Sequence, residues 1–464
     1  MQQKGLAGLL FLVPVAAQAA DIDGARLSLF WALPFAAILL SIALFPMFAE
    51  AFWHRHFGKI VAAITLGFLL PFASWFGLPA TAGLLAHALL VEYLPFLILL
   101  LTLYTLSGGI LLSGRLHATP WLNTRILALG ALLAPVMGTT GAAMLLIRPL
   151  LRANKGRHHK VHVVVFFIFL VGNIGGGLTP LGDPPLFLGF LNGVSFNWTF
   201  IHMLAPVLLS EALLLATFFL LDRHYFRKER HLPAAQAADE PLRLSGHVNL
   251  VLLMVAIGAV LLSGVWKPRL ALSLLGVSLP LQDLARDVTL LVLTGLSLWL
   301  TPRWVRGSNE FNWHPIAEVA KLFVGIFITI APVIAMLRAG ASGPLDGLSR
   351  VVTHASGQPV DPAYFWITGL LSSFLDNAPT YLVFFNMAAG DAHRLMGELS
   401  STLRAISMGA VFMGAMTYIG NAPNFMIKSI ASHHRVRMPG FFGYLAWSGL
   451  FLLPLFVLLT LVFF

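Results

Sequence analysis

Long apolar stretches, separated by short polar segments, dominate the hydropathy pattern of this 464-residue chain. Each is close to the roughly 20 residues that a helix needs to cross a bilayer, which excludes the alternating strands of a membrane barrel. The first six stretches lie at about 29–49, 59–77, 83–112, 124–151, 161–191 and 199–221. After a polar segment, six more lie at about 248–264, 288–302, 316–337, 363–390, 402–431 and 440–463. The pattern predicts an all-α polytopic membrane protein.

The fourth and fifth stretches of each set are interrupted by polar runs rich in glycine and proline. These breaks lie at 137–141, 172–185, 375–380 and 417–424. Their spacing is similar in the two sets: 39 positions separate Thr140 from Thr179 (179 − 140), and 41 separate Thr380 from Asn421 (421 − 380). The repeated spacing predicts an internal duplication.

A topology follows if each fourth stretch is a re-entrant hairpin with its break at the tip. Each half then has five crossings, a hairpin and a broken helix, and an odd number of crossings inverts the second half relative to the first. We predict inverted repeats at 28–221 and 248–463, joined by a cytoplasmic linker at 222–247. Residues 1–20 resemble a cleavable signal peptide, or else an uncleaved short helix, and the mature chain begins outside.

The basic residues support this orientation. Most of the 29 lysines and arginines, Arg148 and Arg157 among them, fall in predicted inner loops, as the positive-inside rule requires. Histidine clusters at 158–162 and 433–434 fall on the same side. They are typical of interfacial charge beside anionic lipid, and a pH-sensing role is the alternative.

Composition narrows the function classes. With 58% hydrophobic and 10% charged residues, the chain cannot be a soluble globular protein, whose share of charged residues is roughly 25%. The absence of cysteine excludes disulfides, thiolate metal sites and iron–sulfur clusters. The net charge of +10 comes from short basic clusters between spans, so nucleic acid is not an expected partner. Because neither an enzyme signature nor a nucleotide-binding motif occurs, we expect gradient-driven transport, no enzymatic activity and no cofactor.

The breaks themselves indicate a transport site. Non-helical backbone at bilayer depth is tolerated only where it lines a protein-enclosed or aqueous site. Packing kinks are the alternative, but single glycines or prolines would suffice for those. Four polar breaks at related positions therefore predict one shared site between half-helix ends, as in inverted-repeat transporters.

Asp183 and Asp376 are the principal candidates, because a carboxylate at bilayer depth is costly and usually marks an ion or proton pathway. Thr179 lies near the first aspartate, and Asn377 and Thr380 follow the second. Hard cations prefer such oxygen ligands, and a carboxylate in an apolar site can hold a proton when the cation leaves. A helix N-cap is the alternative role for each aspartate.

Other intramembrane polar residues are further candidates. Neutral oxygens for the cation could come from Asn173, Thr139, Thr140, Thr417 and Asn421. Bonds to neighbouring helices are the alternative for these residues. Glu211 could relay protons, or else form a pair within the bundle.

Two runs resemble the ion transporter superfamily, in particular its NhaD-like branch of sodium:proton antiporters and citrate transporters. They are Gly-Gly-Gly-Leu-Thr-Pro-Leu-Gly-Asp-Pro-Pro-Leu-Phe-Leu-Gly-Phe at 175–190 and Phe-Leu-Asp-Asn-Ala-Pro-Thr at 374–380. The resemblance implies site roles for Asp183, Asp376, Asn377 and Pro379. It also implies a homodimer in which the first three segments of each half form a scaffold and the remainder moves as an elevator. Divalent anion symporters of the superfamily carry Ser-Asn-Thr at both hairpin tips, which this chain lacks.

These observations predict a secondary transporter that exchanges Na+ or Li+ for H+ across a bacterial-type inner membrane. Asp183 and Asp376 would bind the cation and the proton competitively. The alternative is a transporter of citrate or a related carboxylate, coupled to Na+ or H+, although the breaks contain no arginine that could bind it. A non-transporting membrane scaffold is a third hypothesis, and the paired polar breaks count against it.

Overall fold

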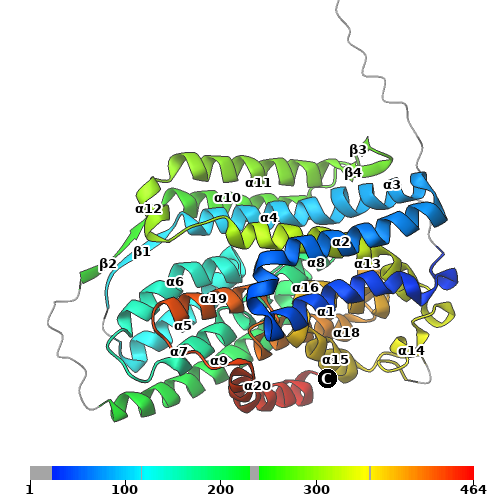
Figure 1. Ribbon diagram of the computed structural model, residues 1–464. Coiled ribbons are helices and arrows are strands. Elements are labelled where there is room, and N and C mark those ends of the chain that lie inside the picture. Colours follow the sequence, from blue (N-terminus) through cyan, green and yellow to red (C-terminus); the bar gives the residue numbers. More distant parts are fainter. Residues whose placement is uncertain (1–22, 117, 230–239, 355–356) are drawn as a thin grey trace, which may run out of the picture.

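The computed structural model describes residues 23–116, 118–229, 240–354 and 357–464 (Figure 1). Within these ranges, nine helices are long and apolar enough to cross a membrane. The described chain is thus a mostly helical polytopic membrane protein, as the sequence predicts, with two short antiparallel ribbons in addition. The predicted signal peptide at 1–20 and residues 230–239 of the predicted linker lie outside the described residues.

The first half contains the hairpin α5–α6 and the broken helix α7–η4–α8, in which η4 is a 3-10 segment. Its elements are η1 (Gly24–Arg26), η2 (Leu29–Ala32), α1 (Leu33–Phe48), α2 (Glu50–Phe76), α3 (Leu78–His87), the π-helical η3 (Ala88–Tyr93), α4 (Leu94–Gly108), β1 (Leu111–Arg115), α5 (Pro120–Met137), α6 (Thr139–Ala153), α7 (Val161–Leu170), η4 (Ile174–Leu178), α8 (Pro184–Leu191) and α9 (Phe196–Lys228).

The second half contains a corresponding hairpin, α15–α16, and the broken helix α18–η6–α19. Its elements are β2 (Glu240–Ser245), α10 (Val248–Val265), β3 (Ala271–Leu274), β4 (Val277–Pro280), α11 (Leu281–Leu300), α12 (Arg303–Ser308), α13 (His314–Arg338), η5 (Gly340–Ser342), α14 (Asp346–Ser349), α15 (Asp361–Phe374), α16 (Asn377–Ala388), α17 (Ala392–Met396), α18 (Ser400–Phe412), η6 (Met413–Met416), α19 (Ala422–His433) and α20 (Phe441–Phe463).

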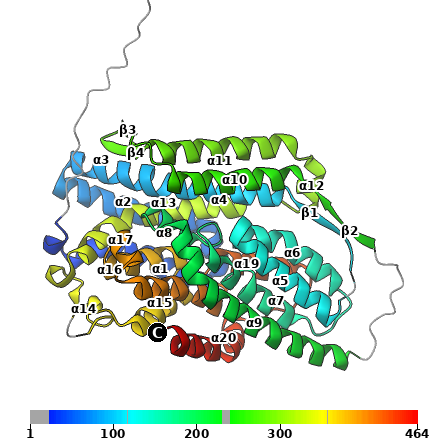
Figure 2. The same cartoon turned by 180° about the vertical axis from the view of Figure 1, so that it is seen from behind.

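The helices form two packed regions. Helices α4, α10 and α11 pack on one another along one edge of the molecule, the upper edge in Figures 1 and 2. The hairpins and broken helices occupy the opposite part, and α13 packs against α1, α2 and α16. Helix α7, which is apolar on all sides, is almost completely buried there, as expected of a helix enclosed by other helices.

The two halves interlock at the breaks. Helix α16 of the second half packs against α8 of the first, and α19 packs against α6 and α7. The β1–β2 ribbon also joins the halves, with Leu112 opposite Leu244. Residues far apart in the sequence therefore meet at the centre of the molecule.

One numerical offset relates the elements around the breaks. Helix α16 begins 238 positions after α6 (377 − 139), and α19 begins 238 positions after α8 (422 − 184). The hydroxyls of Thr179 and Thr417 each donate to a carbonyl 44 residues earlier, those of Pro135 and Ser373, at 2.5 Å. This offset makes Asn421, and not Asp376, the counterpart of Asp183.

Helix α9 ends at Lys228, whereas the sequence pattern predicted its end at 221. Asp222 is polar but completely buried and ion-paired, so it continues the helix and does not begin a solvated linker. The hydropathy pattern could not distinguish a buried, paired carboxylate from an exposed one.

Candidate functional site

The side chain of Asp183 lies where four helix N-termini meet. Asp183 is the N-cap of α8, and its Oδ1 accepts hydrogen bonds from the Thr139 hydroxyl (3.3 Å) and the Asn421 amide (3.1 Å). Its Oδ2 accepts a hydrogen bond from the Asn377 amide at 2.5 Å. Thr139 begins α6, Asn377 begins α16 and Asn421 is the N-cap of α19. The sequence-predicted candidates from all four breaks are thus brought together.

The groups that contact the carboxylate of Asp183 are dipoles and not fixed charges. Helix N-termini carry a partial positive charge and unsatisfied N–H groups, which together form a ready anion site. Within the described part of the chain, the partners of Asp183 are neutral hydroxyl and amide groups, without a lysine, arginine or histidine. Dipoles therefore stabilise the carboxylate, while no fixed cation neutralises it.

Asp376 lies beside this junction and faces the cavity described below. It is the N-cap of α16, and its Oδ1 accepts a hydrogen bond from the Ala378 amide at 3.1 Å. Its carboxylate is close enough to that of Asp183 for the two charges to interact. The N-cap alternative thus holds for the side chain of Asp376, whereas that of Asp183 makes no capping bond to its own helix.

Asn377 connects the two aspartates. Its amide nitrogen bonds Asp183, while its Oδ1 is buried and has no hydrogen-bond partner. A buried acceptor without a partner costs about 1–3 kcal/mol. This oxygen is therefore a candidate cation ligand, together with the neighbouring carboxylates.

A cavity of about 760 Å³ leads to these residues. Asp183, Asp376 and Asn377 line its inner end, together with Thr139, Thr140 and Asn421. Three exposed residues, Glu310, His314 and His433, line its open end. We refer to the two ends as the floor and the mouth of the cavity.

The other predicted threonines have mainly bracing contacts. The hydroxyls of Thr179 and Thr417 tie each break to the preceding hairpin through the carbonyls of Pro135 and Ser373. The Thr380 hydroxyl donates to the backbone carbonyl of Asp376 at 2.8 Å. These bonds fix the backbone around the floor.

Asn173 lies one step behind the floor. It accepts a hydrogen bond from Asn421 at 3.2 Å and donates one to Asn424 at 2.7 Å. Asn424, which sequence reasoning did not select, donates to the carbonyls of Gly414 and Thr417. Glu211 is buried on α9 and is not among the residues that line the cavity, so its relay role stays a prediction.

Arg148 is a cavity residue, whereas the sequence analysis placed it in an inner loop. Helix α6 continues to Ala153, so Arg148 lies within the helix, and its side chain is 9% exposed. Thr140, Met144 and Arg148 all line the cavity. Their spacing of four residues puts them on one helix face, and this spacing was the signal available in the sequence.

Comparison with known families identifies the chain. A family model described as "Putative citrate transport" matches residues 24–464. The chain belongs to this family. Two relatives, uncharacterized transporters of Mycobacterium tuberculosis and Mycobacterium bovis, are each 25% identical over 328 residues, which is 68% of this chain and 71% of the relative. The protein is accordingly a transporter and not an enzyme.

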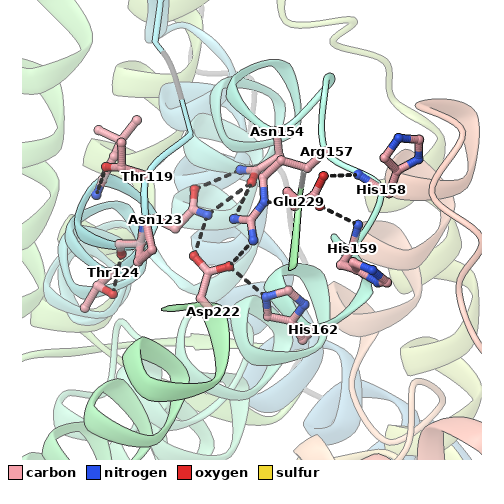
Figure 3. A network of polar contacts seen from close by, with 12 residues as sticks. Thr119, Asn123, Thr124, Asn154, Arg157, His158, His159, His162, Asp222 and Glu229 are labelled. Atoms are coloured by element: carbon pink, nitrogen blue, oxygen red, sulfur yellow. Dashed lines mark hydrogen bonds and ion pairs between the residues drawn. The ribbon is translucent and has the colours of Figure 1, made fainter. Parts of the chain in front are cut away.

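This member of the "Putative citrate transport" family contains a further buried carboxylate away from the cavity, that of Asp222 on α9 (Figure 3). Its Oδ1 contacts Arg157 Nη2 at 2.6 Å and His162 Nε2 at 2.8 Å, and its Oδ2 accepts a hydrogen bond from Asn123 at 2.9 Å. The sequence analysis assigned Arg157 and His162 to a surface loop and an interfacial cluster. Arg157 is buried because the carboxylate of Asp222 neutralises it inside the protein, and the buried ring of His162 is hydrogen-bonded to the same carboxylate.

Glu229 extends this network at the end of α9. Its carboxylate accepts the backbone N–H groups of His158 (3.1 Å) and His159 (2.9 Å). Burial alone would raise the pKa of Glu229, but these two N–H groups and the nearby Arg157 outweigh it and lower that pKa. The carboxylate thus holds the loop between α6 and α7.

Proposed function

We propose that this transporter couples a cation to a proton at the floor of the cavity, as a Na+ (or Li+)/H+ exchanger. The observation that carries the proposal is the pair of carboxylates, Asp183 and Asp376, beside the unpartnered Oδ1 of Asn377. Carboxylate and amide oxygens are the ligands that hard cations prefer. Among the described residues, the hydrogen-bond partners of Asp183 are neutral, so a mobile cation can neutralise the negative charge at the floor.

Coupling follows from competition for the same oxygens. When the cation leaves, one carboxylate takes up a proton, since two adjacent carboxylates in a buried site do not both stay ionised. The release of that proton restores the negative charge that attracts the next cation. Exchange requires only that the loaded floor be exposed to each side of the membrane in turn.

The proposed exposure is inward in the present conformation. The mouth contains Arg148 and His433, and the positive-inside rule places these basic segments in the cytoplasm. The shared offset of 238 positions supports inverted repeats, in which the second half would provide the opposite conformation. The homodimer, the elevator movement and the inner-membrane location stay predictions from the sequence and its family resemblance.

Transport of citrate or a similar carboxylate is the second candidate. The family description favours it, and so does Arg148 in the cavity wall. The sequence analysis counted the absence of an arginine from the breaks against a carboxylate substrate. That argument no longer applies, because the arginine is in the adjoining helix.

Proteoliposomes that contain purified protein and a trapped pH dye test the proposal. Under an imposed pH gradient, added Na+ should move protons with the parent protein, and Asp376→Asn should reduce the rate to that of empty liposomes. Glu398→Gln, which makes the same chemical change at an exposed residue, is the control. If Asp376→Asn dissipates the gradient as fast as the parent does, the exchange mechanism is wrong. Uptake of labelled citrate in a parallel assay would establish the second candidate.

A further inference from the structure

The guanidinium group of Arg148 is incompletely paired. Its Nε and Nη1 are buried without hydrogen-bond partners, and its Nη2 donates to Glu310 at 3.1 Å. The side chain of Glu310 is 67% exposed, while that of Arg148 is 9% exposed. A buried, permanently charged guanidinium is costly unless its donors are satisfied. The Nε and Nη1 donors of Arg148 are therefore available to a further acceptor.

Arg148 lies on the same helix face as the floor but at some distance from it. It follows Thr139, the first residue of α6, by nine positions (148 − 139). At 1.5 Å of rise per residue, this corresponds to roughly 13 Å along the helix axis. A small anion at Arg148 would therefore not contact a cation bound at Asp183.

Two arginines lie close together on the α6 side of the cavity. Arg152 follows Arg148 by four residues on α6 and interacts with it electrostatically. Glu310 pairs with Arg148, and the other ionisable groups that line the cavity outside the floor are Tyr104, His314, Glu318, His433 and His434. The floor is negative and the α6 side of the mouth is positive, so cation and anion have separate positions in one cavity.

The internal offset does not repeat this arginine in the second half. The counterpart of Arg148 in the second half is Asn386 (148 + 238), which accepts a hydrogen bond from Arg338 at 2.9 Å. Thr179 and Thr417, in contrast, make equivalent bonds in both halves. Residues that brace the breaks recur in both halves, whereas the position of the cavity arginine is occupied by Asn386 in the second half.

We propose that Arg148 binds a carboxylate group of the transported anion and that Glu310 occupies the guanidinium until this anion displaces it. The planar fork of arginine matches a carboxylate in two parallel hydrogen bonds. The inference rests on the second candidate function, carboxylate transport, and it names the residue that selects the anion. Cation exchange at the floor does not depend on it.

Equilibrium binding of radiolabelled citrate to the purified full-length protein in detergent tests the inference, because both faces are then accessible. Arg148→Gln should weaken binding at least about tenfold, the equivalent of losing one hydrogen bond to a charged group. Glu310→Gln should strengthen binding several-fold, because the competing carboxylate is removed. In the double variant the gain should disappear. Arg148→Lys, which keeps the charge but not the fork, should recover binding only in part.

A purely structural ion pair predicts a different pattern. In that case Arg148→Gln and Glu310→Gln would both lower the melting temperature, and neither would change citrate binding in the folded fraction. That result, or an absence of citrate binding in the parent and in every variant, would overturn the inference. Na+-driven proton movement, measured separately in the same preparations, would still report whether cation exchange at the floor is correct.

Discussion

Asp183 and Asp222 are both buried carboxylates, 1% and 0% exposed, but their surroundings differ. Asp222 contacts His162 and is ion-paired with Arg157, whose charge offsets its own (Figure 3). Asp183 contacts neutral donors and helix N-termini. A carboxylate with fixed cationic partners is part of the fold, whereas one stabilised by dipoles alone can accept a mobile cation. Burial by itself therefore does not identify a transport residue.

The largest effect is expected from removal of the charge at the floor. Asp183→Asn should reduce Na+-driven proton transport to the level of empty liposomes. The fold should largely persist, because an amide preserves the volume and its oxygen can still accept the two hydrogen bonds that Oδ1 receives. Transport in proteoliposomes and thermal unfolding in detergent measure the two properties. Transport at half the parental rate or more would place the cation elsewhere.

The opposite pattern is expected at Asp222. Asp222→Asn removes the closer carboxylate partner of the buried Arg157 guanidinium and leaves Glu229 at 3.9 Å, and breaking such a buried pair costs about 3–5 kcal/mol. The free energy of unfolding, measured in a chemical or thermal unfolding assay, should fall sharply. The transport rate per folded molecule should be retained. Because Asp222→Asn combined with Arg157→Gln removes both charges, it should lose less stability than the single variant. An unperturbed Asp222→Asn protein would show that the network does not stabilise the fold.

A smaller effect is expected at Asn377, whose Oδ1 is the unpartnered acceptor. Asn377→Ala removes one cation ligand and one donor to Asp183, which should raise the half-saturating Na+ concentration about tenfold. Asn173→Ala is the matched comparison, since Asn173 contacts Asn421 and not the carboxylate. Equal effects of the two substitutions would argue against direct ligation by Asn377.

The internal offset predicts a pair of equal, modest effects. Thr179→Val and Thr417→Val each remove one buried hydroxyl that bonds a carbonyl at 2.5 Å. Each should lower the free energy of unfolding by about 1 kcal/mol. Unequal losses, measured by unfolding in the same detergent, would show that the matched bonds differ in energetic importance.

The smallest effect concerns Glu229, whose pKa is lowered below its ordinary value of 4.5. A lowered pKa means that its contacts contribute stability above the ordinary pKa and lose it as the pH falls through the lowered value. Protection of the His158 and His159 amides against hydrogen exchange, relative to the intrinsic rate at each pH, should thus be high at neutral pH and fall only below about pH 4.5. Loss of protection already between about pH 6 and 7 would contradict the assignment to Glu229.

Much of the architecture could be predicted because its signals are local. Apolar length located the spans, and glycine–proline runs located both hairpin tips and both breaks. Asp183, Asp376, Asn377, Thr139 and Asn421 were selected in this way, and the structure brings them together. The relation of Asp183 to Asn421 by the internal offset was not predicted from the sequence.

Long-range pairing could not be predicted in the same way. Arg157 and Asp222 are 65 positions apart (222 − 157), and each alone resembles a loop residue in a hydropathy pattern. Whether a charged residue near the end of a span is buried depends on a partner that only the packed structure provides. Arg148 was misplaced for the same reason, although its helix face carried a signal.

Proton release on addition of Na+ tests the central claim most directly. In a weakly buffered solution of the purified protein in detergent, Na+ should displace protons from the floor and acidify the medium. The double variant Asp183→Asn and Asp376→Asn should release none, while Glu398→Gln should behave like the parent. Equal proton release from the parent and the double variant would contradict the assignment of these two carboxylates as the shared cation and proton site.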